Sequence, residues 1–265
     1  MSNALTPIID ETRVRLAVRR ESVPVPALEE RAAERALSDP PRGFADALRR
    51  PGLRIIAEHK RSSPSAGIIR ADLVLEDVVA AYDRGGAAAV SVLTEEANFT
   101  GSLEDLAKAR AAAALPVLRK DFIVDPYQVV EAMAGGADAI LLIVAALEPA
   151  QLADLHAQAT ELGLDTLVEV HDAGELEVAA GIGAPVIGIN NRDLTTLAVD
   201  TERTFELLGA IPPGTVVVSE SGWRERHQLE RLHGAGVDAV LIGEALMRAG
   251  DVEAACRSLA VPAFS

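Results

Sequence analysis

Residues 115–144 read LPVLRKDFIVDPYQVVEAMAGGADAILLIV and contain two short apolar runs separated by an amphipathic segment. Both runs are rich in Val, Ile and Leu, which favours strands, while the segment between them has the spacing of a helix. Gly135 and Gly136 stand just before the second run, where glycine ends a helix and turns the chain into the next strand. The stretch therefore predicts a strand, a helix and a second, parallel strand.

The same alternation extends over most of the chain, in which eight apolar runs have centres about 20 to 35 residues apart, as strand–helix units require. They are LRIIAEHK near Ile55, AAAVSVLT near Val90, LPVLRKD near Val117, DAILLIV near Ile140, DTLVEVH near Val168, PVIGINN near Ile187, TVVVSES near Val217 and VDAVLIGE near Val240. Eight such units either close into a barrel or lie open as a doubly wound sheet. The even spacing, and the lack of a Gly-x-Gly-x-x-Gly after the first run, favour the barrel.

We therefore predict an α/β fold, a (β/α)8 TIM barrel that forms a single domain over residues 1–265. Residues 1–50 precede the first run, are rich in Arg, Glu and Ala, and contain Pro24, Pro26, Pro40 and Pro41. They predict an N-terminal helical extension, made of a helix, a proline-rich link and a second helix, that caps one end of the barrel. This extension is too short and too polar to fold alone.

Composition excludes several classes of partner. The net charge of −15 argues against nucleic acid and anionic membranes, which need clustered Lys and Arg. Apolar runs stay below the roughly 18 residues of a membrane span, so a cytoplasmic location without membrane binding is expected. The single cysteine, Cys256, cannot form an internal disulfide, and the five histidines lack the spacing of metal ligands, so we expect neither metal nor cofactor.

Charged residues gather where the predicted strands end, which is the edge at which such barrels build their active sites. Glu58 and Lys60 end the first run and share a face, while His59 points the other way. Lys120, Glu169 and Glu220 end three later runs. Burying five charges at one mouth is costly unless they act together, so we interpret them as a catalytic site rather than an ion-pair network that closes the barrel.

Glycine-containing loops follow the last two predicted strands. They contain Ser221-Gly222 and Gly243-Glu244-Ala245, at the places where barrels of this kind commonly bind phosphate through backbone N–H groups. The sequence therefore predicts a phosphorylated small-molecule substrate. Glu244 is an unfavourable neighbour for a dianion, and its carboxylate should point away or cap the helix.

Six segments, in this order, resemble the indole-3-glycerol phosphate synthase family. They are IIAEHKRSSPSAG at Ile55–Gly67, SVLTEEANFTGSLEDL at Ser91–Leu106, PVLRKDFIVDPYQV at Pro116–Val129, LVEVH at Leu167–His171, IGINNRDL at Ile187–Leu194 and VSESG at Val218–Gly222. The resemblance implies a tryptophan-pathway enzyme that converts 1-(2-carboxyphenylamino)-1-deoxyribulose 5-phosphate to indole-3-glycerol phosphate with loss of carbon dioxide and water. It covers the chain from the first predicted strand to the last.

The resemblance also implies residue roles. Lys120 is similar to the general acid for ring closure, Lys60 to the lysine that holds the substrate carboxylate and assists later proton transfer, and Glu169 to the general base. Glu58, Asn190, Glu220 and Ser221 would complete the polar pocket. Ser63, Gly222 and Gly243 would bind phosphate, Phe99 and Phe122 would pack the anthranilate ring, and Arg192 would face the substrate or anchor its loop. The two lysines and the loop N–H groups are expected to form a cationic patch in a negative protein.

Two other functions fit the sequence less well. Phosphoribosylanthranilate isomerase would want a catalytic cysteine near the end of the first strand, where this chain reads AEHK. A barrel that binds phosphorylated ligands without turnover is disfavoured because Lys60, Lys120 and Glu169 are all present. A monomer is expected, with a weak homodimer as the alternative. His171 is expected to be a hydrogen-bonding loop residue.

Overall fold

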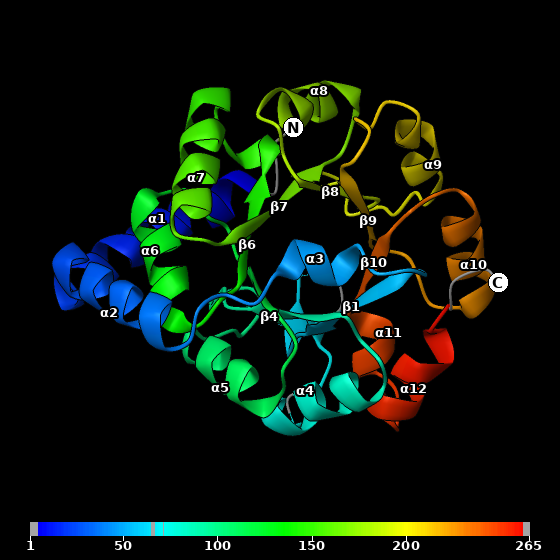
Figure 1. The fold of residues 1–265 in the computed structure, drawn as a ribbon, viewed down its shortest axis with the longest axis horizontal. Coiled ribbons are helices and arrows are strands. Elements are labelled where there is room, and N and C mark those ends of the chain that lie inside the picture. The colour runs from blue at the N-terminus through cyan, green and yellow to red at the C-terminus, as the bar shows by residue number, and fades with distance from the viewer. Residues whose placement is uncertain (1–4, 65–66, 71, 262–265) are drawn as a thin grey trace.

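The computed structural model describes residues 5–64, 67–70 and 72–261. Eight parallel strands form a closed barrel in which each strand pairs with the strands before and after it, and the last pairs with the first. They are β1 (Arg54–His59), β4 (Ala89–Leu93), β5 (Val117–Lys120), β6 (Ala139–Ile143), β7 (Asp165–Val170), β8 (Val186–Asn190), β9 (Val216–Glu220) and β10 (Ala239–Ile242). Each lies within one of the eight predicted runs, so the predicted barrel is confirmed (Figure 1).

Helices follow the strands and cover the outside of the barrel (Figure 1). They are α4 (Leu75–Arg84), α5 (Glu104–Ala112), α6 (Pro126–Gly135), α7 (Pro149–Glu161), α8 (Ala173–Gly181), α9 (Glu202–Leu208), α10 (Arg226–Gly234), α11 (Glu244–Met247) and α12 (Val252–Leu259), with a 3-10 turn, η1 (Val144–Ala146), after β6. Gly136, at the end of α6, has φ +104°, a left-handed conformation that favours glycine. The helix within residues 115–144 therefore ends at a glycine, as the sequence predicted.

Alternation along the strands separates two apolar layers. Ile56, Leu118 and Leu167 point into the barrel and belong to one cluster of buried side chains. Ile55 and Val117, their neighbours in the chain, belong to a second cluster beneath the helices. Because side chains on a strand alternate between two faces, polar residues at the C-terminal ends of the strands can share the inward face with these apolar side chains.

The predicted N-terminal helical extension is confirmed, but within residues 5–50 a third helix follows the two expected ones, and the extension reaches both ends of the barrel. Helix α1 (Leu5–Ser22) contributes Leu5 and Ile8 to the cavity at the C-terminal ends of the strands. Helix α2 (Val25–Ser38) packs beside α6, and α3 (Phe44–Leu48) lies over the centre of the barrel in Figure 1. Phe44 and Leu48 are fully buried in the inner cluster, so α3 closes the end opposite the cavity.

Ion pairs and hydrogen bonds hold this extension in place. Arg19 Nε lies 2.9 Å from Glu131 Oε1 on α6, and the Tyr127 hydroxyl donates to the Val23 carbonyl at 2.9 Å. At the opposite end the amide of Ala45 donates to Asp165 at 2.9 Å. A two-stranded hairpin, β2 (Ser62–Ser63) and β3 (Gly67–Ile68), follows β1 and was not predicted. Among the described helices, none combines the length and the apolar composition needed to cross a membrane.

Candidate active site

A cavity of about 500 Å³ opens at the C-terminal ends of the strands. All thirteen site residues predicted from the sequence line it, namely Glu58, Lys60, Ser63, Phe99, Lys120, Phe122, Glu169, Asn190, Arg192, Glu220, Ser221, Gly222 and Gly243. His59 is not among its lining residues and is 1% exposed on the other face of β1, as the alternation predicted. The structure thus brings the predicted residues together, while their chemical roles stay predictions.

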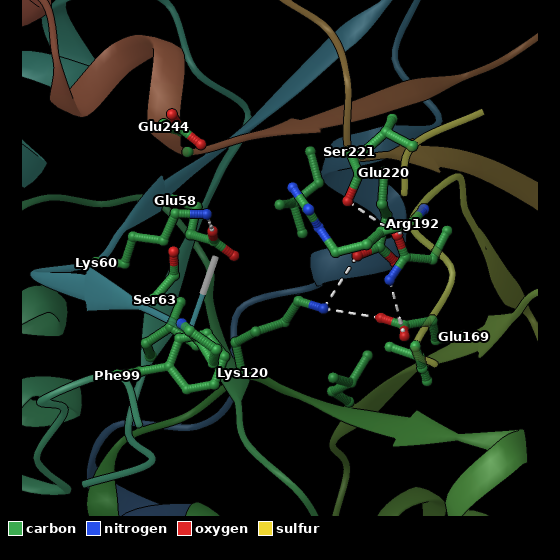
Figure 2. A pocket seen from close by; sticks show the side chains of 18 of the residues that line it. Glu58, Lys60, Ser63, Phe99, Lys120, Glu169, Arg192, Glu220, Ser221 and Glu244 are labelled. Atoms are coloured by element: carbon green, nitrogen blue, oxygen red, sulfur yellow. Dashed lines mark hydrogen bonds and ion pairs between the residues drawn. The ribbon is translucent and has the colours of Figure 1, made fainter. Parts of the chain in front are cut away.

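Lys120 is the centre of a charged cluster in the cavity. Its Nζ lies 2.9 Å from Glu169 Oε2 and 3.0 Å from Glu220 Oε2, so one amine from β5 bridges carboxylates from β7 and β9. Asn190 Nδ2 on β8 donates to the other oxygen of Glu169 at 3.1 Å. Figure 2 shows the Lys120 amine pointing toward Glu169 within the cavity. The strands β5, β7, β8 and β9 thereby fix two donors and two carboxylates.

Gly188 makes room for this cluster. It lies on β8 two residues before Asn190, and a Cβ atom added there would come 2.3 Å from Glu220 Oε1. That oxygen is buried and has no hydrogen-bond partner in the part of the chain that the structure describes. A side chain at this position would therefore displace the Glu220 carboxylate from Lys120.

The cluster shifts the protonation of its members. Burial acts to lower the pKa of Lys120, but the carboxylates of Glu169, Glu220 and Glu58 outweigh it and raise the pKa above its ordinary value. Burial acts to raise the pKa of Glu169, yet Lys120 and His171 lower it overall. For Glu220, burial and the Glu169 charge outweigh Lys120 and raise the pKa to about 7. The amine and Glu169 are therefore charged near neutral pH, while Glu220 exchanges a proton there.

Lys60 forms the second charged pair. Its Nζ lies 2.7 Å from Glu58 Oε1, and Lys60 directly follows β1, which contains Glu58. The Glu58 side chain is 5% exposed, and its other oxygen accepts from the Ser91 hydroxyl at 3.4 Å. This pair lies across the cavity from Glu169 (Figure 2). The two lysines therefore face the same space from separate strands.

The loops after β9 and β10 bring backbone close to the cavity. Ser221 has φ +66° and Gly222 has φ +96°, and the Ser221 hydroxyl donates to Asn190 Oδ1 at 2.9 Å. At Gly243 an added Cβ would lie 2.5 Å from Glu58 Oε1 and 3.1 Å from Lys60 Nζ. Only glycine fits there without moving the β1 pair. Glu244 also lines the cavity, and its carboxylate pairs with Arg248 at 3.0 Å.

Apolar side chains form another part of the wall. Phe99 and Phe122 have ring centroids 6.5 Å apart at a tilt of 42°. Glu95, 6% exposed, accepts hydrogen bonds from the backbone amides of Ala97, Asn98 and Phe99 and so shapes the loop that carries one of these rings. This arrangement provides a slot for a flat, apolar group.

Several contributors were missed by the sequence interpretation. Leu5 and Ile8 of α1 line the cavity, and the spacing of Leu5, Ile9 and Leu16 on the buried side of that helix was the available signal. Arg119, on the outward face of β5, is fully buried and lies 2.9 Å from both Asp121 Oδ2 and Glu131 Oε2. It fixes the strand end that carries Lys120. In the described ranges, no group of three or more His, Cys, Asp or Glu has the arrangement of a metal site.

Solved structures with low sequence identity share the fold. A thiamine phosphate pyrophosphorylase from Pyrococcus furiosus has a TM-score of 0.59 at 19% identity, with 82% of this chain and 96% of that chain covered. An N-acetylmannosamine-6-phosphate 2-epimerase from Clostridium perfringens has a TM-score of 0.61 at 15% identity, covering 77% and 90%. At these identities the likeness concerns the barrel alone.

The fold and the charged mouth together define a β/α-barrel enzyme equipped for acid–base chemistry. The family model for indole-3-glycerol phosphate synthase matches residues 5–259. The chain belongs to this family, whose members are decarboxylating lyases of tryptophan biosynthesis. Its relatives include "Indole-3-glycerol phosphate synthase 2" of Streptomyces coelicolor, 51% identical over 251 residues, covering 95% of this chain and 96% of the relative. The enzyme of Rhizorhabdus wittichii is 48% identical over 263 residues, covering 98% of both.

Proposed function

We propose that this chain converts 1-(2-carboxyphenylamino)-1-deoxyribulose 5-phosphate to indole-3-glycerol phosphate, with loss of carbon dioxide and water. The observation that carries the proposal is the amine of Lys120, held 2.9 Å from Glu169 and 3.0 Å from Glu220 in a cavity that Lys60 also faces. The reaction needs a cationic acid, a site for a carboxylate, a base and a phosphate site. The cavity has candidates for each.

Ring closure requires the ring carbon that bears the carboxylate to attack the ketone carbon. As this carbon–carbon bond forms, the ketone oxygen gains negative charge and needs a proton. Lys120 is placed to donate it, because its neighbours keep the amine protonated and its side chain is only 13% exposed. The proton passes from Nζ to oxygen, and the ketone becomes a hydroxyl.

Decarboxylation and dehydration follow from the other groups. Lys60 would hold the carboxylate out of the aromatic plane until the bond to the ring carbon breaks and carbon dioxide leaves. That loss restores the aromatic benzene ring. In the dehydration, Lys60 would give a proton to the departing hydroxyl, which leaves as water, and Glu169 would take the proton whose loss completes the aromatic indole. Glu58 positions Lys60, and Asn190 and Glu220 position Glu169 and Lys120.

Binding would use the remaining predicted residues. We assign the phosphate to the backbone around Ser221, Gly222 and Gly243, with Ser63 and Arg192 at its side. We assign the anthranilate ring to the slot beside Phe99 and Phe122. Leu5 and Ile8 would cover the substrate from the N-terminal helix.

The decisive experiment is incubation of the purified protein with this ribulose phosphate while indole fluorescence is followed. Product should form with a chelator present, because the proposed steps use amines and carboxylates. Lys108→Ala, an exposed lysine on α5, should match the wild type, whereas Lys120→Ala should be inactive. Inactivity of the wild type, or rescue only by a divalent metal, would remove the proposal.

We further propose a single domain that acts as a monomer in the cytoplasm without a cofactor. Support for the monomer is that the large exposed apolar side chains are scattered over several elements, for example Leu37 on α2, Val74 before α4 and Ile68 on β3. Sedimentation velocity over a range of concentrations tests this, and a mass that rises with concentration would support the weak homodimer instead.

A further inference from the structure

His171 is placed between two carboxylates, directly behind the proposed base. Its Nδ1 makes a hydrogen bond of 3.0 Å with Glu175 Oε2, and its Nε2 lies at an ion-pair distance of 3.4 Å from Glu169 Oε1, without hydrogen-bond geometry. Its backbone amide also donates to Glu175 Oε2, at 2.7 Å. The side chain is 11% exposed and does not line the cavity, so it can act on the substrate only through Glu169.

This geometry decides the protonation of the ring. A neutral imidazole has one N–H and one lone pair, so one of the two carboxylates would then face a lone pair. An imidazolium carries an N–H on both nitrogens, so it can donate to Glu175 through Nδ1 and pair its charge with Glu169 on the Nε2 side. Burial acts to lower the pKa of His171, but the nearby carboxylates of Glu169 and Glu175 raise it to about 10. His171 is therefore cationic throughout the neutral range.

Helix α8 holds the second carboxylate in place. Glu175 is in the first turn of this helix, where the helix dipole favours a negative charge, and its backbone amide donates to Asp172 Oδ1 at 2.9 Å. Glu175 is 20% exposed, while Glu169 is 2% exposed. The groups that face Glu169 are thus Lys120 from β5, Asn190 from β8, His171 and, through the shared amine, Glu220 from β9.

We propose that His171, anchored by Glu175, is a positioning residue that keeps Glu169 anionic and aims its free lone pairs at the substrate. The proposal rests on the proposed function in that Glu169 is taken as the base. The Asn190 amide donates to Oε1 of Glu169, the His171 ring lies 3.4 Å from the same oxygen as an ion-pair partner, and Lys120 donates to Oε2. Removing His171 leaves a carboxylate that rotates more freely and is more readily protonated.

A histidine-specific NMR titration tests the coupling without any assay of turnover. In ¹⁵N-histidine-labelled protein, the His171 signals are those missing from His171→Gln. Both ring nitrogens should stay protonated beyond about pH 8 in the wild type, and Glu169→Gln should lower the titration midpoint by about one pH unit or more. Because coupling between two ionisations is reciprocal, this decrease also measures how far His171 lowers the pKa of Glu169.

Kinetics test the consequence. His171→Gln should lower kcat by about tenfold with a smaller change in KM, since His171 does not contact the cavity. His227→Gln, which breaks an exposed His227–Glu225 pair of similar length, 3.2 Å, is the matched control and should leave both constants unchanged. Glu175→Gln keeps the imidazole but weakens its anchor, so its kcat should lie between those of the wild type and His171→Gln. This variant tests the same role if His171→Gln does not fold.

Each failure has a separate meaning. A His171 midpoint near the ordinary histidine value of about 6.5, or one that Glu169→Gln does not move, overturns the inference whatever the activity. A folded His171→Gln with a kcat within about twofold of the wild type overturns the positioning role. A wild type that makes no indole product refutes the proposed function, while the titration still decides whether His171 and Glu169 are coupled.

Discussion

Replacing Lys120 with alanine separates the catalytic role of its amine from its structural role. The amine is the proposed acid for ring closure, so kcat should fall by about a thousandfold, within the range of lost general acids. The fold should persist, because the β5 strand is anchored by Arg119 on its other face and by apolar neighbours. Loss of activity in a folded protein is the expected outcome.

The stability cost follows from the two contacts. At 2.9 and 3.0 Å, and with an effective dielectric constant of about 20, each attraction is at most about 5–6 kcal/mol, and desolvation offsets most of it. Truncating a partner of a buried pair costs about 3–5 kcal/mol. We expect about 3 kcal/mol at alkaline pH, because His171 and Asn190 still support Glu169.

The cost should depend on pH, with a sign set by Glu220. Its folded-state pKa of about 7 is raised above the ordinary value, so below that pH the carboxyl is neutral and needs no cation. Without Lys120 its pKa rises further, so the variant loses stability relative to the wild type as pH increases through and above about 7. The difference in unfolding free energy should grow from about 1 kcal/mol near pH 6 to about 3 kcal/mol near pH 9.

Urea unfolding at several pH values measures this difference, with Lys108→Ala as the exposed-lysine control. The double variant Lys120→Ala/Glu220→Gln should remove most of the pH-dependent part without restoring turnover. A difference that is flat, or that is largest at acidic pH, would refute the assignment of Glu220. A folded Lys120→Ala with near-normal kcat would refute the assignment of the acid.

Three further outcomes are expected. In a steady-state assay, Gly188→Ala should lower kcat/KM by about tenfold, because its Cβ would lie 2.3 Å from Glu220 Oε1. Gly181→Ala, with open space around the added Cβ, is the control and should leave kcat/KM unchanged. Asp138→Asn should cost about 3 kcal/mol in urea unfolding with kcat nearly unchanged, because this fully buried carboxylate pairs with two arginines far from the cavity. Burial raises the pKa of Cys256 to about 11, so mass spectrometry should find alkylation by iodoacetamide only after unfolding.

The barrel was predictable because its signal is repeated. Each strand lies in a run of β-branched and other apolar residues, and the turn at Gly136 is of the kind its sequence indicates. The elements that were missed carry no periodic signal, since β2 and β3 have two residues each and α3 has five. Helix α3 exists because Phe44 and Leu48 fill the open end of the barrel, a tertiary contact that propensity cannot show.

Strand alternation also placed the site residues, but it could not assign partners. It put Glu58 beside Lys60 because they share a strand face, and the structure has that pair at 2.7 Å. It could not show that Lys120 meets both Glu169 and Glu220, because contacts between strands depend on register around the barrel. His171 was expected to be a hydrogen-bonding loop residue, and it does contact Glu175, but its approach to Glu169 depends on the conformation after β7.

The two lysines were expected to form a cationic patch, but acidic side chains line the same cavity. The lining includes the cations Lys60, Lys120, Arg192 and Arg224, and the acids Glu58, Glu95, Asp121, Glu169, Glu220 and Glu244. Both lysines are already paired with carboxylates, so neither presents an uncompensated charge to approaching substrate. An anionic substrate must therefore displace these ion pairs at short range. Its carboxylate must replace Glu58 as the partner of Lys60, and its carbonyl oxygen must replace Glu169 or Glu220 as the partner of Lys120. Such an exchange favours a molecule that offers both acceptors at once, because either contact alone would leave a buried carboxylate without its cation.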